Sequence, residues 1–139
     1  PELERERHAF GPQRQKGFEA LAIEAERRRV KEAEEAIEAR QRELKDLETR
    51  VADAEAKIVR YKTQQMQVKK QEEYDALTHE IATHRSEIES WEMEQLDLMD
   101  QIEHAEHQLN ALKAEVATRV ATLESHLRTI DDGLAQNEA

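Results

Sequence analysis

Histidines and carboxylates are the residues of this 139-residue sequence that could bind a metal ion. His104 and His107 are three residues apart, with Glu103 and Glu106 beside them. On a helix both imidazoles would share one face and could bind one divalent ion. No third or fourth ligand follows at a suitable spacing. We therefore interpret this segment as a solvated acidic helix face and assign no metal ligand.

A second histidine pattern, His79-Glu80 followed by His84, looks superficially like the helix of a zinc protease. That motif needs two histidines four residues apart, and these are five apart, so they diverge on a helix. We interpret His84 as a polar residue of the helix core. The sequence also lacks cysteine, a Gly-rich phosphate loop and a nucleophile elbow. We expect no enzyme, no catalytic residue and no cofactor in this chain.

The composition points to long helices that must position these side chains. Leu, Ile, Val and Phe number only 27, whereas Ala, Glu, Lys, Leu and Arg together number 77. The first count is typical of disordered chains and the second of coiled coils. Three glycines and two prolines are too few for the turns of a sheet protein.

The spacing of apolar residues decides between disorder and helix. Apolar or small residues recur mostly at alternating steps of three and four, with Arg40 counted as the one charged position of the first seam, which is the pattern of a coiled coil. The first seam comprises Val30, Ala33, Ile37, Leu44, Leu47, Val51, Ala54, Ile58 and Tyr61. The second comprises Tyr74, Leu77, Ile81, His84, Ile88, Trp91, Gln95, Leu98, Ile102, Ala105, Leu109, Leu112, Val116, Val120, Leu123, Leu127 and Ile130.

The two seams are out of phase by two residues, which indicates a break in the helix. We therefore predict an all-α fold, a long antiparallel coiled-coil hairpin with its turn near residues 69–73, over one continuous rod. Folding about this turn would place Ile58 near His84. Gly11-Pro12 and Asp131-Asp132-Gly133 are expected to mark the outer ends of the two helices. The expected parts are an N-terminal extension at 1–11, a first arm at 12–68, the tip at 69–73, an acidic second arm at 74–132 and a C-terminal tail at 133–139.

Charge is divided unequally between the arms. The net charge is −11, of which residues 1–70 contribute +2 and residues 71–139 contribute −13. Residues 86–106 contain eight acids and no Lys or Arg. We expect Arg40, Arg42, Lys45 and Arg50 of the first arm to face them and to favour this pairing.

Two groups of residues are candidates for binding a partner. Trp91 belongs to the seam, and Met93, Leu96 and Met99 add apolar surface away from it, which would serve self-association or a partner helix. The second candidate is the tip, comprising Lys69, Lys70, Glu72, Glu73 and Tyr74. Its lysines could contact phosphate, although the acidic second arm opposes binding of nucleic acid.

The tip also carries a family resemblance. Tyr61, the run from Val68-Lys69-Lys70 to Tyr74-Asp75-Ala76-Leu77, and Glu80-Ile81 resemble a bacterial family of coiled-coil hairpins that end in a C4-type zinc ribbon. Gln71 and Glu72 replace the family's usual Asn and Lys. The resemblance implies a non-enzymatic adaptor, like relatives that act as chaperones or regulators of flagellar and type III secretion proteins. The four ribbon cysteines are absent from this sequence, so either the ribbon lies beyond Ala139 or this protein lacks it. No cofactor is expected in this chain, and the resemblance implies zinc only if such a ribbon follows.

These observations favour a cytoplasmic adaptor or chaperone-like protein that binds protein partners and forms a homo-oligomer. One alternative binds nucleic acid or the transcription machinery through the tip and an outlying zinc ribbon. Another is a structural spacer, or a surface or secreted ligand. No apolar run approaches the roughly 20 residues that span a bilayer, so no membrane association is expected.

Overall fold

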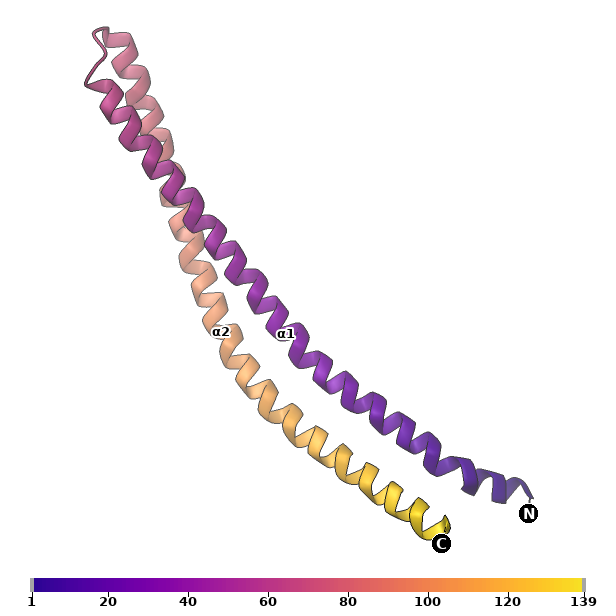
Figure 1. Ribbon diagram of the computed structural model, residues 1–139. Coiled ribbons are helices and arrows are strands. Elements are labelled where there is room, and N and C mark those ends of the chain that lie inside the picture. The colour runs from indigo at the N-terminus through magenta and orange to yellow at the C-terminus, as the bar shows by residue number, and fades with distance from the viewer. Residues whose placement is uncertain (1, 139) are drawn as a thin grey trace. The chain divides into compact units, whose positions relative to one another are not determined.

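Two α-helices joined by a short turn form the structure, a computed structural model that describes the backbone of residues 2–138 and the side chains of residues 11–136. Helix α1 (Glu2–Gln65) leads into a turn at residues 66–70, and α2 (Gln71–Glu138) packs against α1 (Figure 1). No strand occurs in the part of the chain that the structure describes. The predicted all-α helical hairpin is therefore confirmed.

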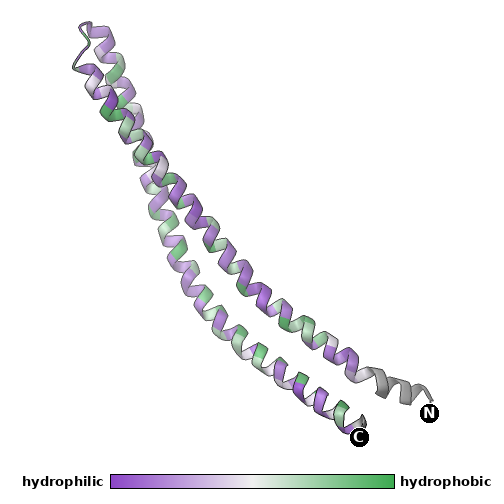
Figure 2. Cartoon of the chain, viewed as in Figure 1, coloured by the Kyte–Doolittle hydropathy of each residue, from purple (hydrophilic) through white to green (hydrophobic). Residues whose placement is uncertain are grey.

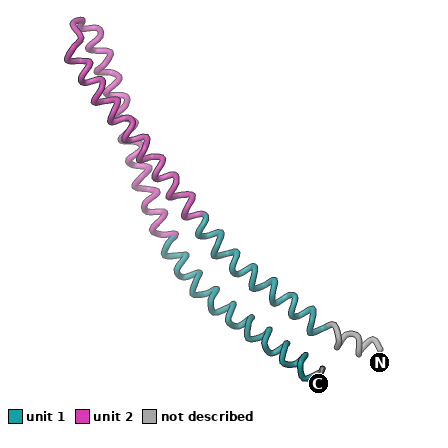
Figure 3. Tube along the Cα trace, in the orientation of Figure 1, with its two compact units in different colours: residues 1–35, 106–139 teal, residues 36–105 magenta. Residues whose placement is uncertain are grey.

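The hairpin divides into two compact units (Figure 3). Unit 1 comprises residues 1–35 and 106–139, and unit 2 comprises residues 36–105 with the turn. Each unit takes one segment from α1 and one from α2.

The predicted seams form the core of both units. The buried apolar residues are Ile23, Ile37, Leu47, Ala54, Ile58, Ile81, Leu98, Ile102 and Val116, and all but Ile23 belong to the predicted seams. Figure 2 shows apolar residues recurring in short stretches along both helices, between polar ones. Every other predicted seam residue is half-buried except Tyr74, which is exposed. Two helices can cover only one stripe of each other, which explains why a few apolar residues suffice for this fold.

The pairing of the helices differs from the expected one. Tyr61, not Ile58, stacks on His84, with ring centroids 5.7 Å apart and 18° between the ring planes. The expected pairing assumed a turn symmetric about residue 71. Gln65, the last residue of α1, instead reaches Thr78, so the first two turns of α2 extend beyond the end of α1. This asymmetry shifts the register by three residues.

The turn lies at residues 66–70, three residues earlier than predicted. The amides of Met66 and Gln67 donate to carbonyls three residues earlier, which tightens the end of α1. The amide of Tyr74 donates to the carbonyl of Lys70 at 3.2 Å and begins α2. Residues 71–73 are polar although they already belong to α2, because no part of α1 lies opposite them and they need no apolar side chain. The apolar pattern therefore placed the connection between the helices too late in the sequence.

The expected helix ends at residues 12 and 132 are also wrong. Helix α1 runs through Gly11-Pro12, and α2 runs through Gly133. No described residue has a positive φ, so Gly133 is an ordinary helical residue and not a left-handed helix end. Pro12 is half-buried and lies near Ile130 and Leu134 of α2, so packing holds the helix together around this proline. The side chains of residues 1–10 and 137–139 lie outside the described residues.

Candidate functional site

The tip residues proposed as a binding site surround the turn. Lys69 and Lys70 are exposed in the turn itself, and Glu72 and Glu73 are exposed in the first turn of α2. Tyr74 is 45 % exposed. It is not a seam residue, because α1 has already ended where Tyr74 would need a partner.

One side chain connects the two helices at the tip. The Gln65 amide nitrogen Nε2 donates to the Tyr74 carbonyl at 3.2 Å and lies 2.7 Å from the Thr78 hydroxyl. Glu72 and Glu73 lie where an α-helix favours negative charge, at its N-terminal end. A shallow groove of about 250 Å³ is lined by Lys62, Gln65, Tyr74, Thr78, Ile81, Ala82 and Arg85. The tip therefore presents charges of both signs around an aromatic ring, without an enclosed cavity.

The second candidate surface is a row of exposed apolar side chains on α2 in unit 2. Met93, Leu96 and Met99 are 68 %, 68 % and 54 % exposed, and they follow one another at steps of three residues. We call these three residues the α2 stripe. Trp91 is separate from it, because this side chain is half-buried on the seam that packs against α1. The heptad step from the Tyr61–His84 pair places the small, buried Ala54 across from this tryptophan.

Acidic side chains surround the α2 stripe. The exposed acids that share its side of α2, by helical spacing, are Glu89, Glu92, Asp100, Glu103 and Glu106. None of the described ion pairs of 4.0 Å or less involves them.

The expected charge pairing of this segment with α1 forms no ion pair of 4.0 Å or less among the described residues. Among the described ion pairs, Arg50 bonds to Asp46 of its own helix at 3.3 Å, and none involves Arg40, Arg42 or Lys45. Ion pairs between α1 and α2 occur instead in unit 1, as between Lys113 and Glu34 at 3.5 Å. Exposed Lys and Arg side chains gain little by ordering themselves into such pairs.

Unit 1 contains two partly buried acids that the sequence analysis missed. The side chains of Glu19 and Glu26 are only 16 % and 17 % exposed. Glu26 lies 2.9 Å from Arg29 and 3.3 Å from Arg119, and Glu19 lies 3.5 Å from His126. Extending the heptad from Val30 toward the N-terminus would have placed both acids on the seam.

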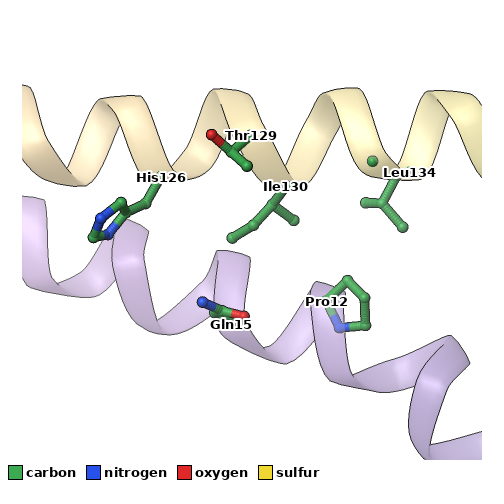
Figure 4. Close-up of a pocket in the computed structure, with 7 residues that line it drawn as sticks. Pro12, Gln15, His126, Thr129, Ile130 and Leu134 are labelled. Atoms are coloured by element: carbon green, nitrogen blue, oxygen red, sulfur yellow. The ribbon is translucent and has the colours of Figure 1, made fainter.

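Unit 1 also has exposed apolar residues and a groove. Phe18 and Leu21 are exposed on α1. The groove, of about 360 Å³, is lined by Pro12, Gln15, His126, Thr129, Ile130, Gly133 and Leu134. Figure 4 shows Ile130 and Leu134 of α2 on the side facing Pro12 of α1. Only His126 among these residues is titratable, so the groove offers space for an apolar group but no constellation for catalysis.

The histidines do not form a metal centre within the described residues. No group there has three or more His, Cys, Asp or Glu side chains placed to hold a metal ion. His84 packs on Tyr61, and its Nδ1 lies 3.4 Å from a Glu87 oxygen without forming a hydrogen bond.

Among the described residues, neither helix is apolar enough over a sufficient length to cross a membrane. No protein-family model, curated protein or solved structure matches the chain. A function can therefore be inferred only from the geometry of the helices and their side chains.

Proposed function

We propose that this protein is a non-enzymatic coiled-coil adaptor, of a chaperone-like kind, that binds protein partners through the α2 stripe. The observation that supports this proposal is the exposure of Met93, Leu96 and Met99 on a helix whose seam is already occupied by α1. Neighbouring apolar side chains in contact with water are a feature of binding surfaces, whereas isolated ones are common on any protein.

The chemistry of the stripe also suits a protein partner. Methionine has an unbranched, polarisable side chain that adapts to differently shaped apolar surfaces. A narrow row along one helix fits a partner helix that lies alongside it. The resemblance of the turn sequence to the bacterial hairpin family supports the same class of function. We extend the proposal to a cytoplasmic protein that self-associates.

The test is site-specific photo-cross-linking in cells. A photoreactive amino acid at Leu96 should give adducts with discrete proteins, and the same amino acid at exposed Ala114 should not. Replacing Met93 and Met99 with Gln should abolish the adducts formed from position 96. Equal adducts from both positions, or none from position 96, would contradict a binding role for the stripe.

The basic residues near the turn support a second candidate function, the binding of nucleic acid. Lys57, Arg60, Lys62, Lys69 and Lys70 are all exposed in or near the turn. Phosphate binding by such a group depends steeply on salt. Fluorescence anisotropy with labelled RNA and DNA should then show affinity that falls with salt and is lost in Lys69→Glu/Lys70→Glu. Absence of binding at low salt would reject this candidate.

A further inference from the structure

The arrangement of acids around the α2 stripe identifies the chemistry of its partner. We propose that the stripe binds a basic amphipathic helix, with apolar residues along one face and Lys or Arg flanking them. This inference rests on the proposed function and adds the class of partner. It follows from the order of acidic and apolar side chains along α2 and from the charges on α1 beside them.

Residues seven apart on a helix lie above one another, and two such rows in α2 have the same order. Leu96 lies between Glu89 and Glu103 in one row. Met99 lies between Glu92 and Glu106 in the next. Leu96 and Met99 thus each have a carboxylate two turns before them and another two turns after them, whereas Met93 has only Asp100, two turns after it. A matching partner has an apolar centre and a cation toward each end.

Helix α1 adds further acids on one side of the stripe. In unit 2, steps of seven residues from the Tyr61–His84 pair place Leu47 of α1 across from Leu98 of α2. Glu48 and Met99 each follow these seam residues and lie on the same flank, and Glu55 is one heptad further along α1. Both glutamates are exposed and unpaired in the described ion pairs. Acidic side chains of both helices therefore lie beside Met99, with the exposed Lys45 one turn before Glu48 on α1.

These charges select among the candidate occupants of the stripe. The phosphates of nucleic acid would be repelled by this surface. A second copy that presented its own stripe would bring two sets of acids together. A basic helix would instead be attracted, and its cations would relieve the repulsion among the carboxylates. From Glu89 to Glu106 the acids extend about 25 Å along α2, the length of a helix of about 17 residues.

The probe is a synthetic 18-residue helix made of Leu and Lys, with leucines on one face. Two control peptides are a scrambled version and a version with Glu in place of Lys. Isothermal titration calorimetry with the full chain should show the amphipathic basic helix binding at least tenfold more tightly than the scrambled peptide. The acidic helix should not bind. Equal affinity for the basic and scrambled peptides would overturn the proposal, because charge alone would then explain the binding.

Matched variants locate the binding on the chain. The affinity for the basic helix should fall at least tenfold in the variant Met93→Gln/Leu96→Gln/Met99→Gln. It should be unchanged in the control Phe18→Gln/Leu21→Gln, which replaces an exposed apolar pair of unit 1. A quadruple variant tests the acids around the stripe: Glu89→Gln, Glu92→Gln, Glu103→Gln and Glu106→Gln. The control variant replaces four acids of α1: Glu24→Gln, Glu32→Gln, Glu35→Gln and Glu38→Gln. The first set should weaken binding at least tenfold and flatten its salt dependence, and the second should do neither.

The failures of the two proposals are distinguishable. If Leu96 forms photo-adducts with partner proteins but the basic helix does not bind, the stripe is a binding site and the inferred partner chemistry is wrong. If the adducts join two copies of this chain, the occupant is a second copy and the basic helix is rejected. An unchanged affinity in the Met93, Leu96 and Met99 variant would also overturn the proposal, since the helix would then bind elsewhere.

Discussion

The rings of Tyr61 in α1 and His84 in α2 stack across the seam of unit 2, 5.7 Å between centroids and 18° from parallel. His84 is a polar residue in a row of apolar ones, and its side chain is only 13 % exposed. The imidazole ring packs better on the flat aromatic ring of Tyr61 than it would on an aliphatic side chain. The pair therefore favours one alignment of the two helices over alignments shifted by a heptad.

A double-mutant cycle on this pair should show energetic coupling. Tyr61→Ala and His84→Ala should each lower the free energy of unfolding of the hairpin. The loss in the double variant should be smaller than the sum of the losses in the two single variants. The coupling should be about 0.5–1.5 kcal/mol, the range of stacked aromatic pairs. Urea denaturation measures each free energy of unfolding. The pair Tyr61→Ala and Leu98→Ala, which is not in contact, should be additive, and additivity at Tyr61 and His84 would reject the stacked arrangement.

Truncation of two neighbouring aliphatic residues of α1 should change stability by very different amounts. Ile58 is 8 % exposed on the seam, whereas Val59 is 65 % exposed. Ile58→Ala should destabilise the protein by about 2–4 kcal/mol, since it removes buried apolar atoms and leaves a cavity. Val59→Ala should change stability by less than about 0.5 kcal/mol, because Ala is the better helix former and little contact is lost. Thermal unfolding followed by circular dichroism compares them, and similar losses would contradict the assigned seam.

Most of the core could be predicted from sequence because a coiled coil encodes burial in the spacing of its apolar residues. Ile37, Ile58 and Ile102 are buried where the heptad placed them. Glu19 and Glu26 escaped prediction because a search for apolar periodicity passes over charged residues on the seam. Glu19 lies near His126 and Glu26 near Arg119, two side chains of α2 that only the folded hairpin brings near.

The turn and the helix ends were harder to predict because they depend on local backbone choices. No Gly or Pro marks the turn, so its position rests on contacts such as that between Gln65 and Thr78. Gly133 and Pro12 gave misleading signals, since their local preferences are outweighed by packing between α1 and α2. The α2 stripe and the acids around it were visible in the sequence, but the absence of described ion pairs between these acids and the basic residues of α1 was not. Whether Arg42 and Lys45 reach the acids of α2 depends on side-chain geometry.

Alanine substitutions at two glycines should stabilise the protein. A Cβ atom added at Gly17 or Gly133 would meet nothing within 4 Å, and both residues lie inside helices without a positive φ. Gly17→Ala and Gly133→Ala should each raise the free energy of unfolding by about 0.5–1 kcal/mol. Chemical denaturation provides the measurement. Destabilisation by Gly133→Ala would show that this glycine ends α2 in a left-handed conformation after all.

Replacement of a seam carboxylate should also stabilise unit 1. Glu26 is partly buried beside Arg29 and Arg119, and Arg119 has a second partner in Glu115 at 2.7 Å. Glu26→Leu should therefore raise the free energy of unfolding by about 1 kcal/mol, because a desolvated ion pair is often less favourable than apolar packing. The control is Glu24→Leu at an exposed position, which should be nearly neutral. A loss of stability in Glu26→Leu alone would mean that the ion pairs outweigh the apolar gain.

Limited proteolysis should identify the turn directly. Lys69 and Lys70 are exposed and lie outside both helices, whereas nearby Lys62 and Arg85 are held within helical backbone. Trypsin should therefore cleave first after Lys69 or Lys70, because a protease needs a locally extended chain. Mass spectrometry should detect the two fragments, and they should remain associated through the seam in native gel filtration. The variant Lys69→Gln/Lys70→Gln should resist this first cut. Early cleavage after Lys62 or Arg85, in the wild-type protein or in this variant, would place the turn elsewhere. The two helices would then be aligned differently, and Tyr61 would not lie opposite His84.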